Sequence, residues 1–156
     1  MISRRCARPA GRYLEHRTTV RVRFQEVDVL QVVWHGHYLS YLEDARMDFG
    51  RAYGISYNDM RAAGVAAPIV SLSCDYLLPA RFDDSLQIVT RLCRRETPKL
   101  EFHFEISRES DGVLLLVAQT TQALTDAADG SLLLTMPPFL RDFYARWDGS
   151  MRSSDE

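Results

Sequence analysis

Cysteine, lysine and long apolar runs are all scarce in this sequence. The three cysteines, Cys6, Cys74 and Cys93, are an odd number and form no CxxC pair, so the sequence indicates neither a disulfide framework nor a zinc knuckle. The longest apolar run covers residues 113–118, against the roughly 20 residues that a membrane-spanning helix needs. No apolar segment follows the N-terminal arginines, as it would in a signal peptide. We therefore expect no membrane insertion and a location in the reducing cytoplasm.

Positive charge comes almost entirely from arginine and is concentrated near the N-terminus. Residues 1–23 carry seven arginines against one glutamate. A basic arm of this kind can bind nucleic acid or an anionic lipid surface, but this one lacks interleaved aromatic residues apart from Tyr13. We predict no nucleic-acid partner and interpret residues 1–16 as a flexible leader. The leader is followed by one domain at residues 17–148, which is long enough to form a single core. A polar tail at residues 149–156 comes last.

The hydrophobic pattern changes along the chain from strand to helix and back to strand. Val20, Val22 and Phe24 alternate with polar residues, which predicts a strand over residues 18–24. Apolar residues at helical spacing predict a long helix over 38–53, ended by Gly54, and a short helix over 56–63. Further strands are predicted at 69–76, 86–92, 100–106, 113–125 and 131–135, with a terminal helix at 139–147. The apolar helix needs a sheet to cover it, so we predict an α+β fold with a curved antiparallel sheet around one long helix.

The segment of residues 26–38, between the first strand and the long helix, has an unusual composition for a loop. It holds Glu26, Asp28, His35 and His37 around an apolar patch, and it ends where the first N–H groups of a helix lack intrahelical partners. Helix N-termini favour negative charge, so main-chain donors there could hold an oxyanion while a neighbouring side chain does chemistry.

Each of these residues also has a structural interpretation. Asp28 could form a turn or a local cap. The two histidines could bind a metal with Glu26, but an H-x-H pair without a third ligand is weak evidence, so we predict no metal site. Gly36 is interpreted as a residue that lets the chain turn into the helix, and Trp34 as a core, interface or substrate residue. The sequence contains no GxSxG, Walker, GxGxxG or HExxH motif that would compete as a site.

The same segment carries a family resemblance. The stretch Arg21-x-Arg-Phe24-x-Glu-x-Asp28-x-x-x-Val32-Val-Trp34-His35-x-x-Tyr38, with the helix that follows, resembles the 4-hydroxybenzoyl-CoA thioesterase-like branch of the hotdog-fold acyl-CoA thioesterases, including the Tol-Pal-associated group. The resemblance covers about residues 18–147 and extends to Tyr76-x-x-Pro79 and Asp83-Asp84. It implies a hotdog fold, hydrolysis of an acyl-CoA or acyl-carrier thioester, no cofactor beyond the CoA of the substrate, and a homodimer or homotetramer.

The resemblance also implies roles for individual residues. By position, Asp28 corresponds to the family's essential aspartate, the nucleophile or general base, and His35 to the histidine whose backbone N–H faces the thioester oxygen. Gln31 stands where the family commonly has glycine, which leaves the loop shape and the acyl preference open. We expect Gln31, Trp34 and Tyr38 to contact the substrate, and Glu26 to have a supporting role.

Some alternatives stay open at this stage. A dehydratase or hydratase on the same fold, or a non-catalytic acyl-CoA or acyl-carrier-binding module, would share most of these residues. Arg94, Arg95 and Lys99 cluster in one strand connection and are predicted to contact CoA phosphates; a solvated basic turn is the alternative. Arg46 and Asp48 are predicted on the helix face opposite the core, at a groove or an interface between copies, because an exposed sheet edge invites a second chain.

Overall fold

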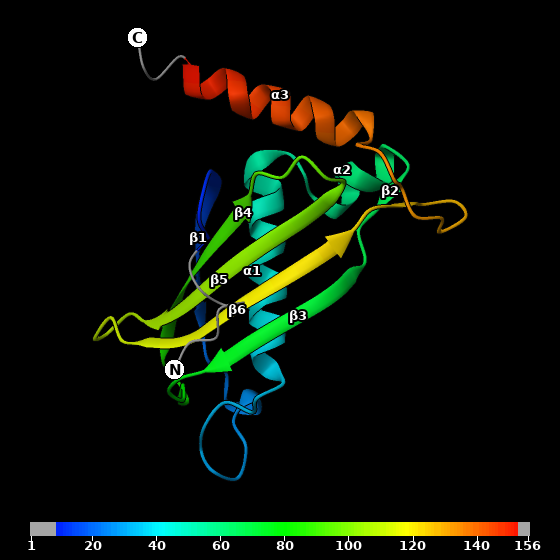
Figure 1. The fold of residues 1–156 in the computed structure, drawn as a ribbon. Coiled ribbons are helices and arrows are strands. Elements are labelled where there is room, and N and C mark those ends of the chain that lie inside the picture. Colours follow the sequence, from blue (N-terminus) through cyan, green and yellow to red (C-terminus); the bar gives the residue numbers. More distant parts are fainter. Residues whose placement is uncertain (1–8, 153–156) are drawn as a thin grey trace.

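The computed structural model describes residues 9–152 and has the predicted α+β architecture. Five strands form one antiparallel sheet, in the spatial order β1 (Tyr13–Arg21), β4 (Ser85–Cys93), β5 (Lys99–Arg108), β6 (Leu114–Ala123) and β3 (Ile69–Tyr76). The long helix α1 (His37–Tyr53) runs along one face of this sheet (Figure 1). β1 and β3 are therefore its two edges.

The alternation of side chains along the strands decides what meets α1. Leu86, Ile88 and Leu92 of β4 are fully buried in the core cluster, while Gln87, Val89 and Arg91 point to the other face of the sheet. α1 supplies an apolar stripe at helical spacing, buried to 3% exposure or less: Tyr38, Tyr41, Leu42, Ala45 and Phe49. The core thus lies between α1 and the sheet and holds the helix in a fixed position.

The smaller elements complete the ends of the sheet. They are the 3₁₀ helix η1 (Phe24–Glu26), the helix α2 (Tyr57–Ala62), a two-stranded ribbon of β2 (Val65–Ala66) and β7 (Thr125–Asp126), and the terminal helix α3 (Pro138–Arg152). Ser56 caps the start of α2, because its hydroxyl accepts a hydrogen bond from the N–H of Asp59. α3 lies across one end of the sheet (Figure 1). No helix of the described residues is long and apolar enough to cross a membrane.

The predicted first strand, last strand and terminal helix differ from the structure. The first strand begins at Tyr13 and ends at Arg21, so residues 13–16, assigned to the leader, pair with β4, and Phe24 is in η1. Residues 131–135 do not form a strand, because only Leu132 makes a bridge, to Thr125. The terminal helix begins earlier and ends later than residues 139–147. Half of the predicted leader, residues 1–8, and half of the predicted tail, residues 153–156, lie outside the described residues.

The segment that was predicted to carry chemistry lies at one end of the sheet. The N–H of Val22 donates to the carbonyl of Asp84, just before β4 begins. Residues 22–36 then form a loop that projects below the sheet before the chain enters α1 (Figure 1). The connection between β4 and β5 is at the opposite end, beneath α3.

Candidate active site

The loop before α1 is a tight, hydrogen-bonded turn. Val27 and Val33 form an antiparallel bridge, the N–H of Asp28 donates to the carbonyl of Val32 at 2.9 Å, and the N–H of Gln31 donates to the carbonyl of Asp28 at 2.9 Å. Gln31 has a φ of +62°, in the left-handed region that favours glycine. Glycine adopts this backbone conformation more easily than glutamine does, which explains why the family motif commonly has glycine at the position of Gln31.

The turn fixes the side chain of Asp28. One carboxylate oxygen, Oδ1, accepts a hydrogen bond of 2.8 Å from the N–H of Leu30. Within the described part of the chain, the other oxygen, Oδ2, has no hydrogen-bond or ion-pair partner. A carboxylate held by one oxygen and free at the other can attack a carbonyl carbon or take a proton from water.

Asp28 lines an open cleft of about 800 Å³ whose other lining residues are mostly apolar: Phe24, Val27, Val29, Gln31 and Phe82. The edge of the Phe24 ring meets the Phe82 ring, with 5.8 Å between centroids. Val29 is 97% exposed, so the cleft is open to water in a single chain. The structure therefore brings Asp28 and Gln31 together against one apolar wall.

The start of α1 lies at the other arm of the same turn. The indole of Trp34 is packed between the rings of His35, at 4.8 Å, and His37, at 5.4 Å. A Cβ on Gly36 would lie 2.1 Å from Cζ3 of Trp34, although the φ of Gly36, −72°, is ordinary for a helix. The prediction that Gly36 serves the turn of the chain is thus wrong: glycine makes room for the Trp34 ring.

The N–H groups at this helix start are available as donors. Among the described residues, the N–H of His35 and that of Gly36, which directly precede α1, have no hydrogen-bond acceptor. The N–H of His37, by contrast, donates to the carbonyl of Trp34 at 2.9 Å. Main-chain N–H groups without an acceptor are the kind of donor that can stabilise an oxyanion. Asp28 and His35 line two separate clefts in the single chain.

A second cleft, of about 290 Å³, opens beside His35. It is lined by Val33, His35, Tyr38, Tyr76, Leu77, Leu78 and Pro79. Tyr38, predicted to bind substrate, is 3% exposed, and its hydroxyl accepts a hydrogen bond of 2.9 Å from the N–H of Ala80. Burial raises the pKa of Tyr38 above its ordinary value. Its ring forms one wall of the cleft, while its hydroxyl is committed to the backbone.

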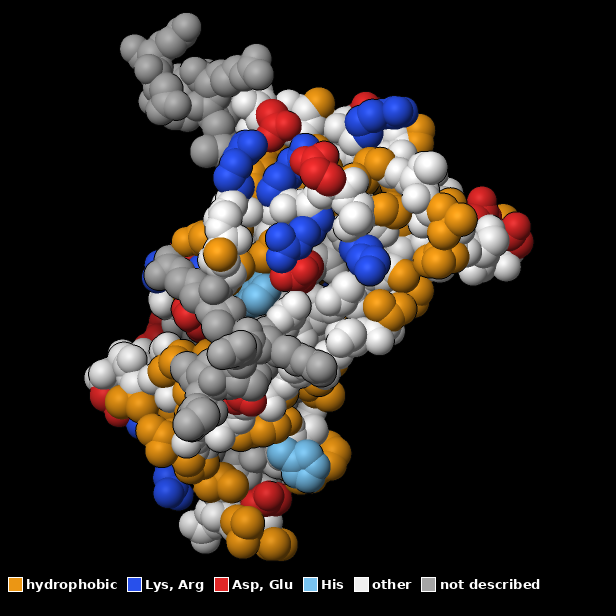
Figure 2. All heavy atoms as spheres, viewed as in Figure 1, with side chains coloured by type: hydrophobic (Ala, Val, Ile, Leu, Met, Phe, Trp, Pro, Cys, Tyr) orange, Lys and Arg blue, Asp and Glu red, His pale blue; other side chains and the backbone are white. Residues whose placement is uncertain are grey.

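The three predicted phosphate-binding cations are at the far end of the molecule. They follow the C-terminal end of β4, whose other end meets the loop that carries Asp28. Because β4 has nine residues, the cations and this loop are roughly 25 Å apart within one chain. Figure 2 shows apolar side chains around the lower end and charged side chains beside α3 at the upper end. The structure therefore does not bring these cations to Asp28 of the same chain.

Two of these cations are engaged in ion pairs. Arg94 lies 3.8 Å from the centroid of the Tyr144 ring and pairs with Glu96 at 3.1 Å and Asp148 at 3.5 Å. Arg95 donates two hydrogen bonds, of 3.0 and 2.7 Å, to the carboxylate of Glu101. Lys99, at the start of β5, is exposed. These contacts favour a structural role for Arg94 and Arg95, and their contact with CoA stays a prediction.

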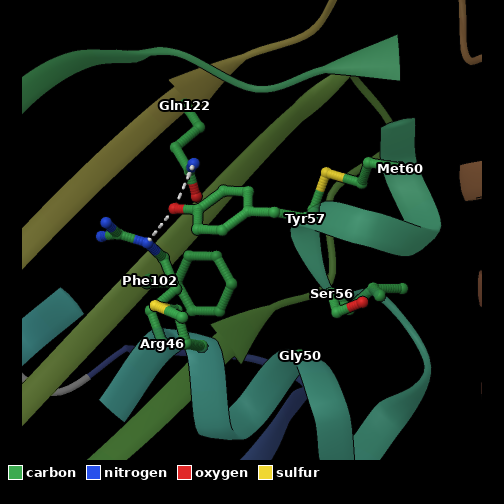
Figure 3. A pocket seen from close by; sticks show the side chains of 9 residues that line it. Arg46, Gly50, Ser56, Tyr57, Met60, Phe102 and Gln122 are labelled. Carbon is green, nitrogen blue, oxygen red and sulfur yellow. Dashed lines mark hydrogen bonds between the residues drawn. The ribbon is translucent and has the colours of Figure 1, made fainter. Parts of the chain in front are cut away.

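Arg46 is buried, contrary to the prediction that it lies opposite the core. It is 6% exposed; its Nε donates to the hydroxyl of Tyr57 at 2.8 Å and its guanidinium pairs with Glu43 at 3.0 Å. Gln122 approaches the same hydroxyl at 3.5 Å, beside a cavity of about 10 Å³ (Figure 3). The cavity has room for about one water molecule, so this network is structural. Asp48 is partly exposed and accepts a hydrogen bond from Thr18 at 3.0 Å.

Metal-type ligands converge elsewhere in the chain. Within the described residues no third ligand joins His35 and His37. Ligand atoms of Cys93, Glu101 and His103 lie within 4.8 Å of one another, but Arg95 occupies both oxygens of Glu101. Burial and the charge of Glu101 raise the pKa of Cys93 to about 12, so the thiol is protonated at neutral pH. This arrangement favours an ion-pair cluster over a metal centre.

Sequence reasoning missed the contact made by Tyr76. Its hydroxyl donates a hydrogen bond of 2.9 Å to the main-chain carbonyl of His35, across 41 positions of sequence. The only signal was the place of Tyr76 in the motif Tyr76-x-x-Pro79, which says nothing about its partner.

Comparison with known proteins places this geometry in a family. The family model of the thioesterase-like superfamily matches residues 22–144. The solved structure of the hypothetical protein TT1821 from Thermus thermophilus is 32% identical, with a TM-score of 0.74 over 85% of this chain and 97% of that one. The acyl-CoA thioester hydrolase YbgC of Escherichia coli is 33% identical over 86 residues, which are 55% of this chain and 64% of that protein.

A further structure supports the architecture. The DHNA-CoA thioesterase from Staphylococcus aureus superposes with a TM-score of 0.77 over 90% of this chain and 95% of that chain, at 21% identity. The match to the family model includes the turn that carries Asp28 and the whole of α1. The chain therefore has the hotdog fold and belongs to the thioesterase-like superfamily, as the resemblance in residues 21–38 predicted.

Proposed function

We propose that this chain is an acyl-CoA thioesterase, which hydrolyses a thioester to a free acid and CoA with Asp28 as nucleophile or general base. The observation that carries the proposal is the position of Asp28: a carboxylate with one free oxygen, on an apolar cleft, in the turn that leads into α1. Membership of the thioesterase-like superfamily and the named activity of the relative YbgC support it.

The proposed mechanism uses only groups of this turn. Oδ2 of Asp28 attacks the thioester carbonyl or takes a proton from the attacking water, while the N–H of Leu30 keeps the carboxylate in place. The carbonyl oxygen becomes an oxyanion, which the free N–H groups of His35 and Gly36 stabilise. The tetrahedral intermediate then collapses and CoA leaves as a thiolate. In the general-base route the proton held by Asp28 is passed to the thiolate, directly or through water, and the free acid is released. In the nucleophilic route the acyl group stays on Asp28 as an anhydride, which water hydrolyses to the free acid and the restored carboxylate.

The substrate residues follow from the same placement. Gln31 shares the cleft of Asp28, and Trp34 lies half-exposed against His35. We assign these two side chains to contacts with the acyl or pantetheine part of the substrate. The ring of Tyr38 forms part of the wall of the second cleft.

A second copy of the chain is part of this proposal. A carboxylate is a weak base and a weak nucleophile, and it works best where bulk water is excluded, yet the cleft of Asp28 is open in one chain. Among the described residues, no strand pairs with the outer side of the edge strand β3, which exposes Ile69, Val70, Leu72 and Tyr76. This combination invites pairing with another chain. We therefore expect at least a homodimer in the cytoplasm, and light scattering that gives a stable, active monomer at micromolar concentration would contradict it.

The test is release of free CoA from a panel of acyl-CoAs, followed with a thiol reagent. A hydratase or a binding module would release none. Asp28→Asn keeps the shape of the side chain and removes its charge, so kcat on the best substrate should fall on the order of 10²-fold or more with folding intact. Asp44→Asn, an exposed aspartate of α1, is the matched control and should keep the full rate. An Asp28→Asn enzyme with a near-normal rate would remove the proposed mechanism.

A further inference from the structure

Tyr76, the last residue of β3, connects the edge of the sheet to the start of α1. Its hydroxyl donates to the carbonyl oxygen of His35 at 2.9 Å. Its backbone is paired with Leu116 of β6, and its ring meets the edge of the Tyr38 ring, with 5.5 Å between centroids. Tyr38 is itself held by the N–H of Ala80. Tyr76 is 49% exposed, but these contacts fix the direction in which its hydroxyl points.

The carbonyl of His35 is not fixed by the helix. In a continuous helix the N–H of Leu39 would donate to it, but that N–H donates instead to the carbonyl of Gly36, at 3.2 Å. Among the described residues, Tyr76 is the only donor to the His35 carbonyl. Without the hydroxyl of Tyr76, no hydrogen bond within the described chain would fix the orientation of the peptide between His35 and Gly36.

The orientation of that peptide decides where a free donor points. The peptide unit is planar and trans, so the C=O of His35 and the N–H of Gly36 point in opposite directions. A hydrogen bond that holds the carbonyl therefore also aims the N–H of Gly36, which has no acceptor in the described chain. The same bond polarises the peptide and makes its N–H a stronger donor.

We propose that Tyr76 is a positioning residue for catalysis: by holding the carbonyl of His35, it aims the N–H of Gly36 at the oxyanion that forms during thioester hydrolysis. The inference rests on the proposed function. Burial raises the pKa of Tyr76 to about 12, so its hydroxyl keeps the proton that it donates throughout the neutral range. The benefit falls mainly on the transition state, because the oxyanion accepts a stronger hydrogen bond than the ground-state carbonyl.

The test is Tyr76→Phe, which removes the hydroxyl and keeps the ring. Loss of a whole oxyanion donor costs on the order of 10²–10³-fold in kcat. Tyr76→Phe leaves the donor in place but frees its direction, so we expect a smaller loss in kcat, on the order of 10-fold, with KM within about twofold of wild type. Tyr53→Phe is the matched control, because the hydroxyl of Tyr53 also donates to a main-chain carbonyl, that of Glu15 at 2.6 Å, at the other end of α1. It should leave kcat unchanged.

A spectroscopic measurement separates positioning from a general structural effect. Selective labelling with [¹⁵N]glycine gives resonances from the eight glycines of the chain, and the one missing in Gly36→Ala identifies Gly36. Tyr76→Phe should shift the Gly36 amide resonance, and Tyr53→Phe should not. This measurement needs no substrate.

The outcomes separate the inference from the function on which it rests. Wild-type release of CoA with an unchanged kcat in Tyr76→Phe would overturn the inference and leave the thioesterase assignment standing. A rise in KM alone, or a fall in kcat without a shift of the Gly36 amide, would also overturn it, since Tyr76 would then act by another route. If the wild-type enzyme released CoA from no substrate, the proposed function would fail and the inference with it.

Discussion

The substitution Gly36→Ala tests why α1 begins with a glycine. Gly36 has a helical backbone, with φ −72° and ψ −27°, which alanine adopts without strain. Through the backbone alone, the substitution should raise the free energy of unfolding by about 0.4–1 kcal/mol. The new Cβ, however, would lie 2.1 Å from Cζ3 of Trp34, so the indole must move by about 1.3 Å to reach the 3.4 Å at which ordinary contact begins.

The cost of that movement exceeds the backbone gain. The indole would leave the rings of His35 and His37, whose centroids lie 4.8 and 5.4 Å from its own. Aromatic pairs contribute about 0.5–1.5 kcal/mol each beyond their buried area, and the half-exposed position of Trp34 favours the lower part of that range. The loss is then about 1–2 kcal/mol, and we expect Gly36→Ala to lower the free energy of unfolding by about 0.5–1 kcal/mol.

A double-mutant cycle isolates the contact. In a Trp34→Ala background the ring is absent, so Gly36→Ala should stabilise the fold by about 0.4–1 kcal/mol, which gives a coupling between the two sites of about 1–2 kcal/mol. Urea unfolding followed by far-ultraviolet circular dichroism measures all four proteins without relying on tryptophan fluorescence. An equal effect of Gly36→Ala in both backgrounds would refute the reasoning.

Three further substitutions test the hydrogen bond of Tyr38, the backbone of the loop at Gln31, and the ion pairs of Glu15 on the outer face of the sheet. Tyr38→Phe should destabilise the fold by about 1–3 kcal/mol in urea unfolding, because it leaves the buried N–H of Ala80 without its acceptor. Gln31→Gly should stabilise it by about 0.5 kcal/mol or more, since relief of the left-handed backbone exceeds the entropic cost of glycine; Gln31→Ala, which keeps the strain, should not. Burial raises the pKa of Glu15, but hydrogen bonds and charge from Arg91 and then Arg17 outweigh it and lower that pKa below its ordinary value of 4.5. The stability from Glu15 is thus present above pH 4.5 and lost as the pH falls further, and Glu15→Gln should flatten this acid-induced loss in unfolding titrations.

The regular elements could be predicted because their burial repeats along the chain. α1 and β5 follow their apolar periods closely. The start of β1 was missed because His16, a polar residue, faces α1, where it lies 3.7 Å from Asp48. Residues 131–135 were wrongly predicted as a strand because their leucines are apolar, yet Leu132 and Leu134 are 58% and 80% exposed. Apolar character predicts a strand only where the sheet has a place for it.

Arg46 shows how tertiary contacts override the pattern of a helix. A charged residue in an amphipathic helix is expected to face solvent, but the side chain of Arg46 is satisfied by Tyr57 and Glu43 and can therefore be buried. Tyr57 belongs to α2, which follows α1 after a turn at Gly54. The spacing within α1 carries no information about that partner.

In the candidate site, too, local features could be predicted from the sequence and tertiary contacts could not. The sequence predicted that Asp28 and His35 lie at the helix start and in the turn before it, because both features are local; the catalytic roles of the two residues stay predictions. The direction of the N–H donors before α1 is not local, since it depends on a tyrosine hydroxyl delivered by the register of β3 against β6. The same applies to the exclusion of water: Val29 is 97% exposed, so the apolar residues around Asp28 make a wall but not an enclosure. The proposed chemistry needs a carboxylate that is shielded from bulk water, and a single chain leaves the loop around Asp28 exposed to water. The proposal therefore requires a second copy of the chain to cover this loop.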